Sequence, residues 1–196
     1  DNETLLHVTT SYGYLESTQH LISLNKIDIT AKDNEGKTIL HNACKNDNLE
    51  LIQYLISLDK LDINAKTEDD ETPLNFAIKK EQLPIIKYLT SLPGIDLNIK
   101  DKNNKTYLHL ASDTWGNEPI MNYLLSLNQI QLDTKDEKGR TILHYACEKE
   151  SLDLIKTLTK RPELDVTATD SEGMNILHIS CKSVKDINII RFIVSL

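Results

Sequence analysis

Arginine is scarce in this sequence, and acidic residues outnumber basic ones. Arg140, Arg161 and Arg191 are the only arginines among 22 Lys and Arg residues, against 30 Asp and Glu, which leaves a formal net charge of −8. Proteins that bind duplex nucleic acid usually carry a clustered basic face, and arginine is the side chain best suited to bidentate phosphate binding. The composition therefore argues against a nucleic-acid partner.

Long apolar runs are also missing. No stretch of about 20 apolar residues is present that could span a membrane. No basic segment followed by an apolar one opens the chain, as it would in a signal peptide. The first residue is Asp and not Met, so we expect a fragment of a longer protein, in which a targeting signal could lie elsewhere. From the absent signal, together with the cysteines discussed below, we expect a cytoplasmic or otherwise intracellular location.

A six-residue phrase, Thr-X-Leu-His-X-Ala, recurs along the whole chain. It occupies residues 4–9, 38–43, 72–77, 106–111, 141–146 and 175–180, so four of the five steps between its starting residues are 34 residues long and one is 35. A fixed period of this size is typical of a stack of small similar units and not of a single globular core. We expect one domain, residues 1–196, whose units are approximately 1–32, 33–66, 67–100, 101–135, 136–169 and 170–196.

The stretch from residue 33 to 66 shows what one repeat encodes. Residues 33–37 have the composition of a turn, and Gly36 lies where a positive φ is expected. The other repeats fill this place with residues that tolerate the same conformation, namely Asp70, Asn104, Gly139 and Gly173. Thr38 lies where a helix N-cap belongs, and a short helix to about Lys45 follows. A second helix is predicted from an apolar stripe formed by Leu51, Ile52, Leu55 and Leu58.

The three cysteines, Cys44, Cys147 and Cys181, directly follow the phrase in their repeats. An odd number of cysteines at equivalent positions argues against disulfides and indicates a reducing compartment. No pair of them has the spacing of zinc ligands. We expect all three to be buried thiols with a structural role.

These repeats resemble the ankyrin-repeat family, whose signature is Thr-Pro-Leu-His-X-Ala. The resemblance covers the whole chain and extends to the Asp-X-X-Gly turn and to hairpin ends such as residues 62–64. It implies an all-α fold, a solenoid of stacked antiparallel helix pairs with projecting β-hairpin-like loops. It also implies a concave face, formed by loops and first helices, that binds another protein or peptide.

The chain departs from the family pattern in two places. The glycine that usually separates the two helices of a repeat is replaced by Asp47, Glu81 and Glu150. The first repeat has Ser17 and Thr18 where the others have apolar residues. Polar residues in an end repeat indicate either a cap, which solenoids need for solubility, or ordinary variation in a longer array.

Five histidines belong to the phrase, namely His7, His41, His109, His144 and His178. Stacking would place them in a row, which is one way to build a metal site or a proton relay. The family resemblance instead implies that this histidine hydrogen-bonds the turn of a neighbouring repeat. Asn75 replaces it in the third repeat and could keep such a bond, but would be a poor catalyst. We therefore predict no catalytic residue, cofactor, metal site or enzymatic activity.

The resemblance places partner contacts at the loop tips and at the exposed ends of the first helices. Carried onto this sequence, the candidates are Lys37, Lys45, Asn46, Glu68, Asp69, Glu71, Lys79, Lys80, Lys102, Lys105, Asp113, Trp115, Lys138, Arg140, Lys149, Met174 and Lys182. Residues 68–71 make an acidic loop tip. A basic row is predicted along the first-helix ends, formed by Lys45, Lys79, Lys80, Lys149 and Lys182. These charges are either an ordinary solvated face or a groove for an acidic or mixed-charge peptide.

Trp115 is the only tryptophan, and it lies in an inserted stretch, residues 113–117, that makes the fourth repeat one residue longer. It is either a loop contact for a partner, as exposed aromatics often are, or a side chain folded back on the neighbouring helix. Asn64 and Asn98 match a hairpin position that asparaginyl hydroxylases modify in some family members, and the sequence leaves their modification open.

The sequence as a whole favours a non-enzymatic scaffold for protein–protein interaction that acts as a monomer. The alternative is that the chain is the targeting or substrate-recruiting arm of a larger enzyme or effector protein. Because one fold serves many functions, the resemblance does not identify the partner.

Overall fold

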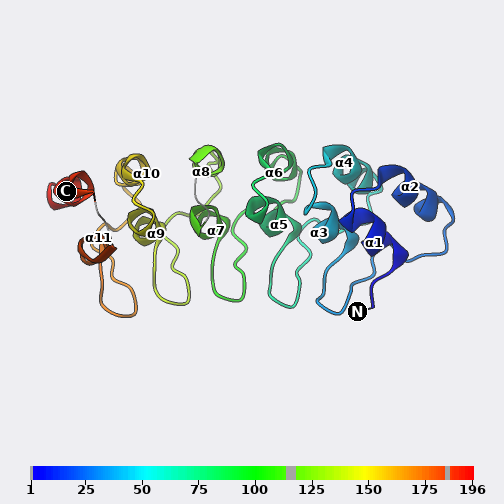
Figure 1. Cartoon of the computed structure of the whole chain (residues 1–196), viewed down its shortest axis with the longest axis horizontal. Coiled ribbons are helices and arrows are strands. Elements are labelled where there is room, and N and C mark those ends of the chain that lie inside the picture. Colours follow the sequence, from blue (N-terminus) through cyan, green and yellow to red (C-terminus); the bar gives the residue numbers. More distant parts are fainter. Residues whose placement is uncertain (1, 114–117, 184–185) are drawn as a thin grey trace. The chain divides into compact units, whose positions relative to one another are not determined.

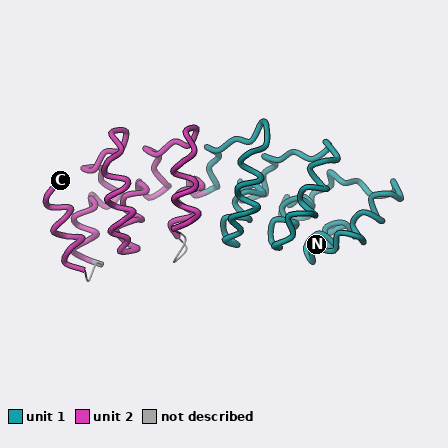
Figure 2. Tube along the Cα trace, turned by 90° about the horizontal axis from the view of Figure 1, so that it is seen from above, with its two compact units in different colours: residues 1–102 teal, residues 103–196 magenta. Residues whose placement is uncertain are grey.

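The computed structural model describes residues 2–113, 118–183 and 186–196. These ranges contain twelve α-helices and no strand, which confirms the predicted all-α fold. The chain divides into two compact units, residues 1–102 and 103–196 (Figure 2). No helix in the described ranges is long and apolar enough to cross a membrane.

The first unit contains three helix pairs. They are α1 (Leu5–Ser11) with α2 (Leu15–Ser23), α3 (Ile39–Ala43) with α4 (Leu49–Ser57), and α5 (Pro73–Lys79) with α6 (Leu83–Thr90). The two helices of each pair contact each other, and α3 packs against both α1 and α5. The loops that join successive pairs in this unit project from the side of the first helices (Figure 1).

The second unit repeats this arrangement. Its pairs are α7 (Tyr107–Asp113) with α8 (Glu118–Leu125), α9 (Ile142–Glu148) with α10 (Leu152–Leu158), and α11 (Ile176–Ser183) with α12 (Ile187–Val194). The first helix of the middle pair, α9, packs against both α7 and α11. Each repeat of the sequence thus corresponds to one helix pair.

Four of the first helices, α1, α3, α7 and α9, begin at the Thr of the phrase because Thr and His together cap them. In α3 the Thr38 N–H donates to His41 Nδ1 at 3.0 Å, and the Thr38 hydroxyl lies 2.9 Å from the same nitrogen. This is a capping box in which His takes the place of the more usual Glu or Gln. The first helices have only five to eight residues, too few to be stable alone in water, so they depend on packing against their neighbours.

The phrase also supplies much of the core. Leu40 and Ala43 of α3 are fully buried, as are Leu51, Ile52 and Leu55 of α4. Burying one Leu or Ile side chain contributes about 1.5–3 kcal/mol to folding. The apolar stripe predicted from the sequence is therefore the surface that holds the pairs together.

The predicted left-handed turns are present. The backbone φ angle lies between 57° and 76° at Gly36, Asp70, Asn104, Gly139 and Gly173. Glu81 and Glu150, which separate the two helices of their pairs, also have positive φ angles, 57° and 53°. This conformation costs a residue with a Cβ roughly 1–2 kcal/mol. The left-handed backbone that glycine usually adopts between the two helices is therefore retained at these two places at some cost in stability.

The prediction that all three cysteines are buried was wrong for one of them. Cys44 and Cys147 are buried, but Cys181 is exposed. Cys147 lies on α9, which packs against α11 of the next repeat. Cys181 lies on α11 itself, and no later repeat of the described chain packs on that helix. The same sequence position is thus buried only where a following repeat covers it.

Candidate functional site

The histidines of the phrase join each repeat to the next turn. His7 Nε2 lies 3.0 Å from the Lys37 carbonyl oxygen, and His41 Nε2 lies 3.1 Å from that of Glu71. The second unit shows the same pairing for His109 with Arg140 at 3.3 Å and His144 with Met174 at 3.1 Å. Since Nδ1 accepts the Thr N–H in the capping box, Nε2 carries the proton and donates to the carbonyl.

Burial keeps three of these rings neutral, those of His41, His109 and His144. It lowers the pKa of His41 and of His109 to about 4, and it also lowers the pKa of His144. A neutral ring whose two nitrogens are both hydrogen-bonded offers no free lone pair to a metal ion. Among the described residues, no group of three His, Cys, Asp or Glu is placed to hold a metal ion. The histidine row therefore has the structural role that the resemblance implied.

Asn75, which replaces the histidine in the third repeat, makes the same capping hydrogen bonds with the Thr of the phrase. Its Oδ1 accepts the Thr72 N–H at 2.9 Å and the Thr72 hydroxyl at 2.7 Å. A side-chain oxygen at this place is thus sufficient to cap α5. In the last repeat His178 is exposed, and its Nδ1 lies 2.7 Å from Asn175 Oδ1.

The loop tips that carry most of the candidate residues are tied to one another by backbone hydrogen bonds. In the first unit Glu68 N–H donates to the Glu35 carbonyl at 2.9 Å, and Lys102 N–H donates to that of Asp69 at 3.0 Å. In the second unit the same bonds join Glu137 to Asn103 at 2.9 Å and Ser171 to Lys138 at 2.8 Å. The tips therefore form an ordered edge within each unit, on which the side chains differ from repeat to repeat.

At two of the tips, which glycine occupies, the loops leave no room for a Cβ. A Cβ on Gly36 would lie 3.0 Å from the Glu68 backbone nitrogen, and one on Gly139 would lie 3.1 Å from the Ser171 nitrogen. Backbone atoms cannot move aside as a flexible side chain does. These two glycines thus permit a closer approach of the loops as well as the positive φ angle, whereas Asp70 and Asn104 lie beside equivalent hydrogen bonds.

One lysine of the first unit, Lys45, lies beside an aromatic ring. Lys45 Nζ lies 5.7 Å from the centre of the Phe76 ring and donates to Asn42 Oδ1 at 2.9 Å. Burial, and then the charge of Lys37, lower the pKa of Lys45. Lys79 forms an ion pair with Glu71. The predicted basic row is in this unit a mixed surface of cations, one acid and the half-buried Phe76.

The acidic tip at residues 68–71 is partly neutralised. Lys102 Nζ lies 2.6 Å from Asp69 Oδ1, and this hydrogen bond lowers the pKa of Asp69 and raises that of Lys102. Glu71 is held by Lys79, which leaves Glu68 as an exposed acid of the tip. The Lys102–Asp69 pair is exposed on both sides, and such pairs contribute little to stability.

Asn46 has a structural role in addition to its predicted one. Its Nδ2 donates to the carbonyl oxygens of Thr10 at 3.1 Å and Ser11 at 2.7 Å. These carbonyls lie at the end of α1, where no further helical turn supplies donors, and that of Thr10 also accepts the Gly13 N–H at 3.1 Å. The Asn46 amide donors are therefore used inside the protein.

A buried polar cluster lies in the second unit, where only Arg140 was predicted. Arg140 Nε donates to Asp136 Oδ2 at 3.0 Å, and Arg140 Nη2 donates to the Tyr145 hydroxyl oxygen at 2.7 Å. The Tyr145 hydroxyl in turn donates to Asp136 Oδ2 at 2.7 Å. Burial raises the pKa of Asp136, but the bonds from Tyr145 and Arg140 outweigh it and leave this pKa below its usual value.

Sequence reasoning missed Asp136, Tyr145 and Phe76. Phe76 and Tyr145 occupy the fifth place of the phrase, where the ring also contacts the histidine of the preceding repeat in the same unit. An aromatic at this variable place was the available signal. The phrase itself leaves that position unspecified, so the repeat pattern alone does not mark these rings.

Of the remaining candidates, Lys105 and Lys149 contact residues near the cluster, and the others differ in their exposure. Lys105 pairs with Asp113 and lies 5.5 Å from the centre of the Tyr145 ring. Lys149 Nζ donates to the Asp113 carbonyl oxygen at 3.0 Å. Lys138 and Lys182 are exposed, as is Lys80 in the first unit, and Met174 is half-buried. Trp115 lies outside the described residues.

Comparisons with known proteins agree with the repeat pattern. The family description "Ankyrin repeats (3 copies)" matches residues 5–101, 60–136 and 108–196. No curated protein sequence matches the chain significantly. A chain in the solved structure of a predatory endopeptidase from Bdellovibrio bacteriovorus in complex with an immunity protein superposes with a TM-score of 0.84 at 22% identity, covering 100% of this chain and 99% of that one. The present chain belongs to the ankyrin-repeat family.

Proposed function

We propose that this protein is a binding scaffold without enzymatic activity, and that it holds a partner protein or peptide on the face formed by the loop tips and first helices. Ankyrin repeats generally serve protein–protein interaction, and the similar solved structure is a complex of two proteins. The free cysteines agree with an intracellular location, which we also propose.

The observation that carries the proposal is the hydrogen-bonded edge of loop tips in each unit. Its backbone bonds, such as Glu68 N–H to the Glu35 carbonyl, fix the tips before any partner arrives. Binding to a fixed surface loses less conformational entropy than binding to flexible loops. The charged side chains on this edge differ between repeats, which suits recognition of one particular partner surface.

The charges narrow the class of partner. Lys45, Lys79 and Lys80 of the first unit lie at first-helix ends, and Lys45 is partly desolvated beside Phe76. A peptide with acidic and apolar side chains would match both the cations and the ring. Such binding should weaken as ionic strength rises, since salt screens exposed charges.

Affinity purification with the 196-residue chain as bait tests the proposal. We expect captured proteins to be lost when exposed tip and helix-end charges are reversed in a Glu68→Lys, Lys80→Glu and Lys138→Glu variant. The matched control reverses exposed charges on and beside the second helices, Glu50→Lys and Lys160→Glu, and should keep the partners. Loss in the control but not in the first variant would show that binding uses another face.

A further inference from the structure

Opposite charges face each other along the first helices of three repeats. In these repeats the residue just before the phrase forms an ion pair with the residue seven places after its Thr. The pairs are Glu71 with Lys79, Lys105 with Asp113, and Arg140 with Glu148. The two positions therefore hold one cation and one carboxylate together in each of the three repeats.

The second repeat has a cation at both positions, Lys37 and Lys45, and it is the only repeat that does. Burial lowers the pKa of Lys45, and the charge of Lys37 lowers it further. The two ammonium groups are thus close enough to repel each other. The Lys37 side chain is only 19% exposed, so water screens this repulsion less than it would at an open surface. This place holds two cations where its equivalents hold an ion pair.

The acids near the two lysines do not supply the missing carboxylate. Asp33 Oδ1 accepts the backbone N–H groups of Glu35 and Lys37, both at 2.9 Å. Glu35 pairs with Lys37 from the loop tip, where its side chain is 71% exposed. In the described part of the chain, no carboxylate lies within ion-pair distance of Lys45. Its ammonium group has three N–H donors, and the neutral Asn42 Oδ1 accepts one of them at 2.9 Å.

A partly open aromatic ring completes this place. Phe76 is half-buried, and the centre of its ring lies 5.7 Å from Lys45 Nζ. Tyr145 has the same position in the second unit but is fully buried, and both Arg140 and Lys105 lie over its ring, at 4.4 and 5.5 Å from the centre. The third repeat has an acid at the position of Arg140, so the Phe76 ring lacks this cover.

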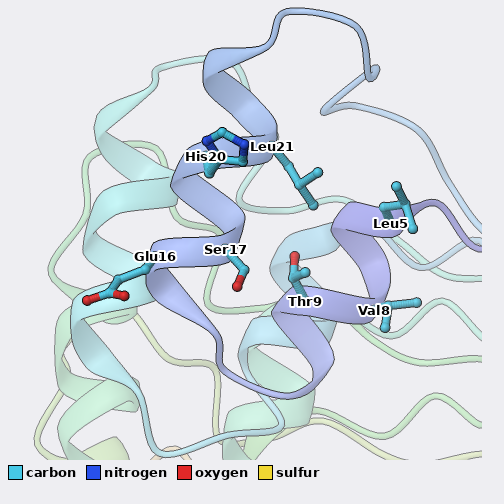
Figure 3. A pocket seen from close by; sticks show the side chains of 7 residues that line it. All are labelled: Leu5, Val8, Thr9, Glu16, Ser17, His20 and Leu21. Carbon is cyan, nitrogen blue, oxygen red and sulfur yellow. The ribbon is translucent and has the colours of Figure 1, made fainter.

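The two lysines and the ring lie inside the stack of repeats. Figure 3 shows a different kind of surface, a groove of about 460 Å³ between α1 and α2, lined among others by Leu5, Val8 and Leu21. The equivalent surface of the second repeat is covered by the first repeat. Because α3 already has α1 and α5 as neighbours, a further repeat at either end of the chain would not cover the two lysines.

We propose that Lys37 and Lys45 together bind one carboxylate group of the partner, from an Asp or Glu side chain, and that an apolar side chain next to it covers the Phe76 ring. The partner's carboxylate takes the place that Asp113 and Glu148 fill in their own repeats. Hydrogen bonds between an ammonium group and a carboxylate are stronger than neutral ones. This inference rests on the proposed function, and it adds which group of the partner binds and where.

Peptides selected on the immobilised 196-residue chain from a phage-displayed library of random dodecapeptides test the proposal. We expect them to share an acidic residue next to an apolar one. Replacing that acid by its amide should weaken binding about tenfold, measured by fluorescence anisotropy at constant ionic strength. Lys45→Gln and Lys37→Gln should each cause a similar loss. The peptide change combined with Lys45→Gln should cost little more than either alone, because both remove the same bond.

The matched control is Lys79→Gln. Lys79 has the position of Lys45 one repeat later, but it already pairs with Glu71. Its substitution should therefore weaken peptide binding much less. Equal losses for Lys45→Gln and Lys79→Gln would overturn the proposal, since the peptide would then respond to positive charge in general. Urea unfolding of each variant confirms that a lost affinity is not a lost fold, and two site variants are available in case one does not fold.

The outcomes separate this inference from the proposed function. Peptides that bind the chain but share no acid, or that bind Lys37→Gln and Lys45→Gln as they bind the unmodified chain, would overturn the carboxylate site and leave the binding scaffold standing. A chain that selects no peptide and captures no protein would overturn both.

Discussion

At the scale of single residues, the histidine of the phrase determines much of the local structure. Its Nδ1 caps its own helix, and its Nε2 bonds the following turn, as His41 does with Thr38 and Glu71. Both bonds require the neutral ring with the proton on Nε2. Both ring nitrogens of this histidine therefore form structural hydrogen bonds, and the side chain serves to connect neighbouring repeats.

This commitment predicts a pH dependence of stability. The pKa of His41 and of His109 is about 4 in the folded chain, against an ordinary value of 6.5. Because the folded pKa is the lower one, their contribution is fully present above pH 6.5 and is lost as the pH falls toward 4. Each should reduce the free energy of unfolding by up to about 1.4 kcal/mol per pH unit in this window.

Urea unfolding followed by circular dichroism at several pH values measures this loss. His109→Asn should make the dependence shallower, since Asn75 shows that an amide can serve in the same place. His20→Asn, at an exposed position, is the control and should leave the slope unchanged. A slope that is equal in all three proteins would mean that these buried rings do not carry the effect.

The roles of single residues were predictable where they depend on neighbours in the sequence. Thr38 as a cap and Asp70 in a left-handed turn follow from the chemistry of a few adjacent residues. The bond between Tyr145 and Asp136 does not, because it depends on a loop and a helix whose separation in space is set by the fold.

At the scale of elements, the helix pair and its loop form one structural piece, and the loop tip is the part that meets the next repeat. A comparison of Gly36 with Gly173 distinguishes two reasons for a glycine at the tip, the positive φ angle and the close approach of the next loop. Both have a positive φ angle, 75° and 76°, but only Gly36 has a neighbouring backbone close to where a Cβ would be. Open space surrounds Gly173 within 4 Å.

The two glycines form a matched pair of substitutions. Gly173→Ala should cost about 1 kcal/mol of unfolding free energy, the ordinary penalty of a left-handed alanine. Gly36→Ala should cost clearly more, because its Cβ would lie 3.0 Å from the Glu68 backbone nitrogen and the neighbouring loop would have to shift. Chemical denaturation gives both values, and hydrogen exchange of the Glu68 amide should accelerate only in Gly36→Ala. Equal costs would mean that the tips gain nothing from their contact.

Helix existence, order and starting points were predictable from the period and the Thr caps. The surface between elements was less so. The basic row was predicted as a line of lysines, but in the first unit Lys79 is paired with Glu71 and Lys45 lies beside Phe76. Side chains from two repeats contact each other there, and the sequence pattern of a single repeat does not predict such contacts.

At the scale of the whole molecule, the chain contains two compact units of three helix pairs each. In a repeat protein, stability is approximately a sum of terms from each repeat and from each contact between neighbours. About three repeats are needed before these contacts outweigh the entropy of ordering the chain. Each unit therefore contains enough repeats to fold by itself.

Separate expression of residues 1–102 and 103–196 tests this expectation. Both fragments should show helical circular dichroism and a cooperative urea transition. Residues 1–66, with two helix pairs only, are the control and should remain largely unfolded. A three-pair fragment without a cooperative transition would contradict the expectation that the nearest-neighbour contacts within a unit are sufficient.

The sequence by itself determined the family, the number of helix pairs, their caps and their left-handed turns. All of these are local, since they depend on residues within one period and on the constancy of that period. The tertiary structure decided which residues at equivalent positions of the repeats are buried and which are exposed. Cys147 is buried and Cys181 is exposed, and Leu5 is exposed where Ile39 is buried. The physical reason is that the burial of a side chain depends on which element packs against it. The sequence of one repeat does not specify whether another repeat covers it.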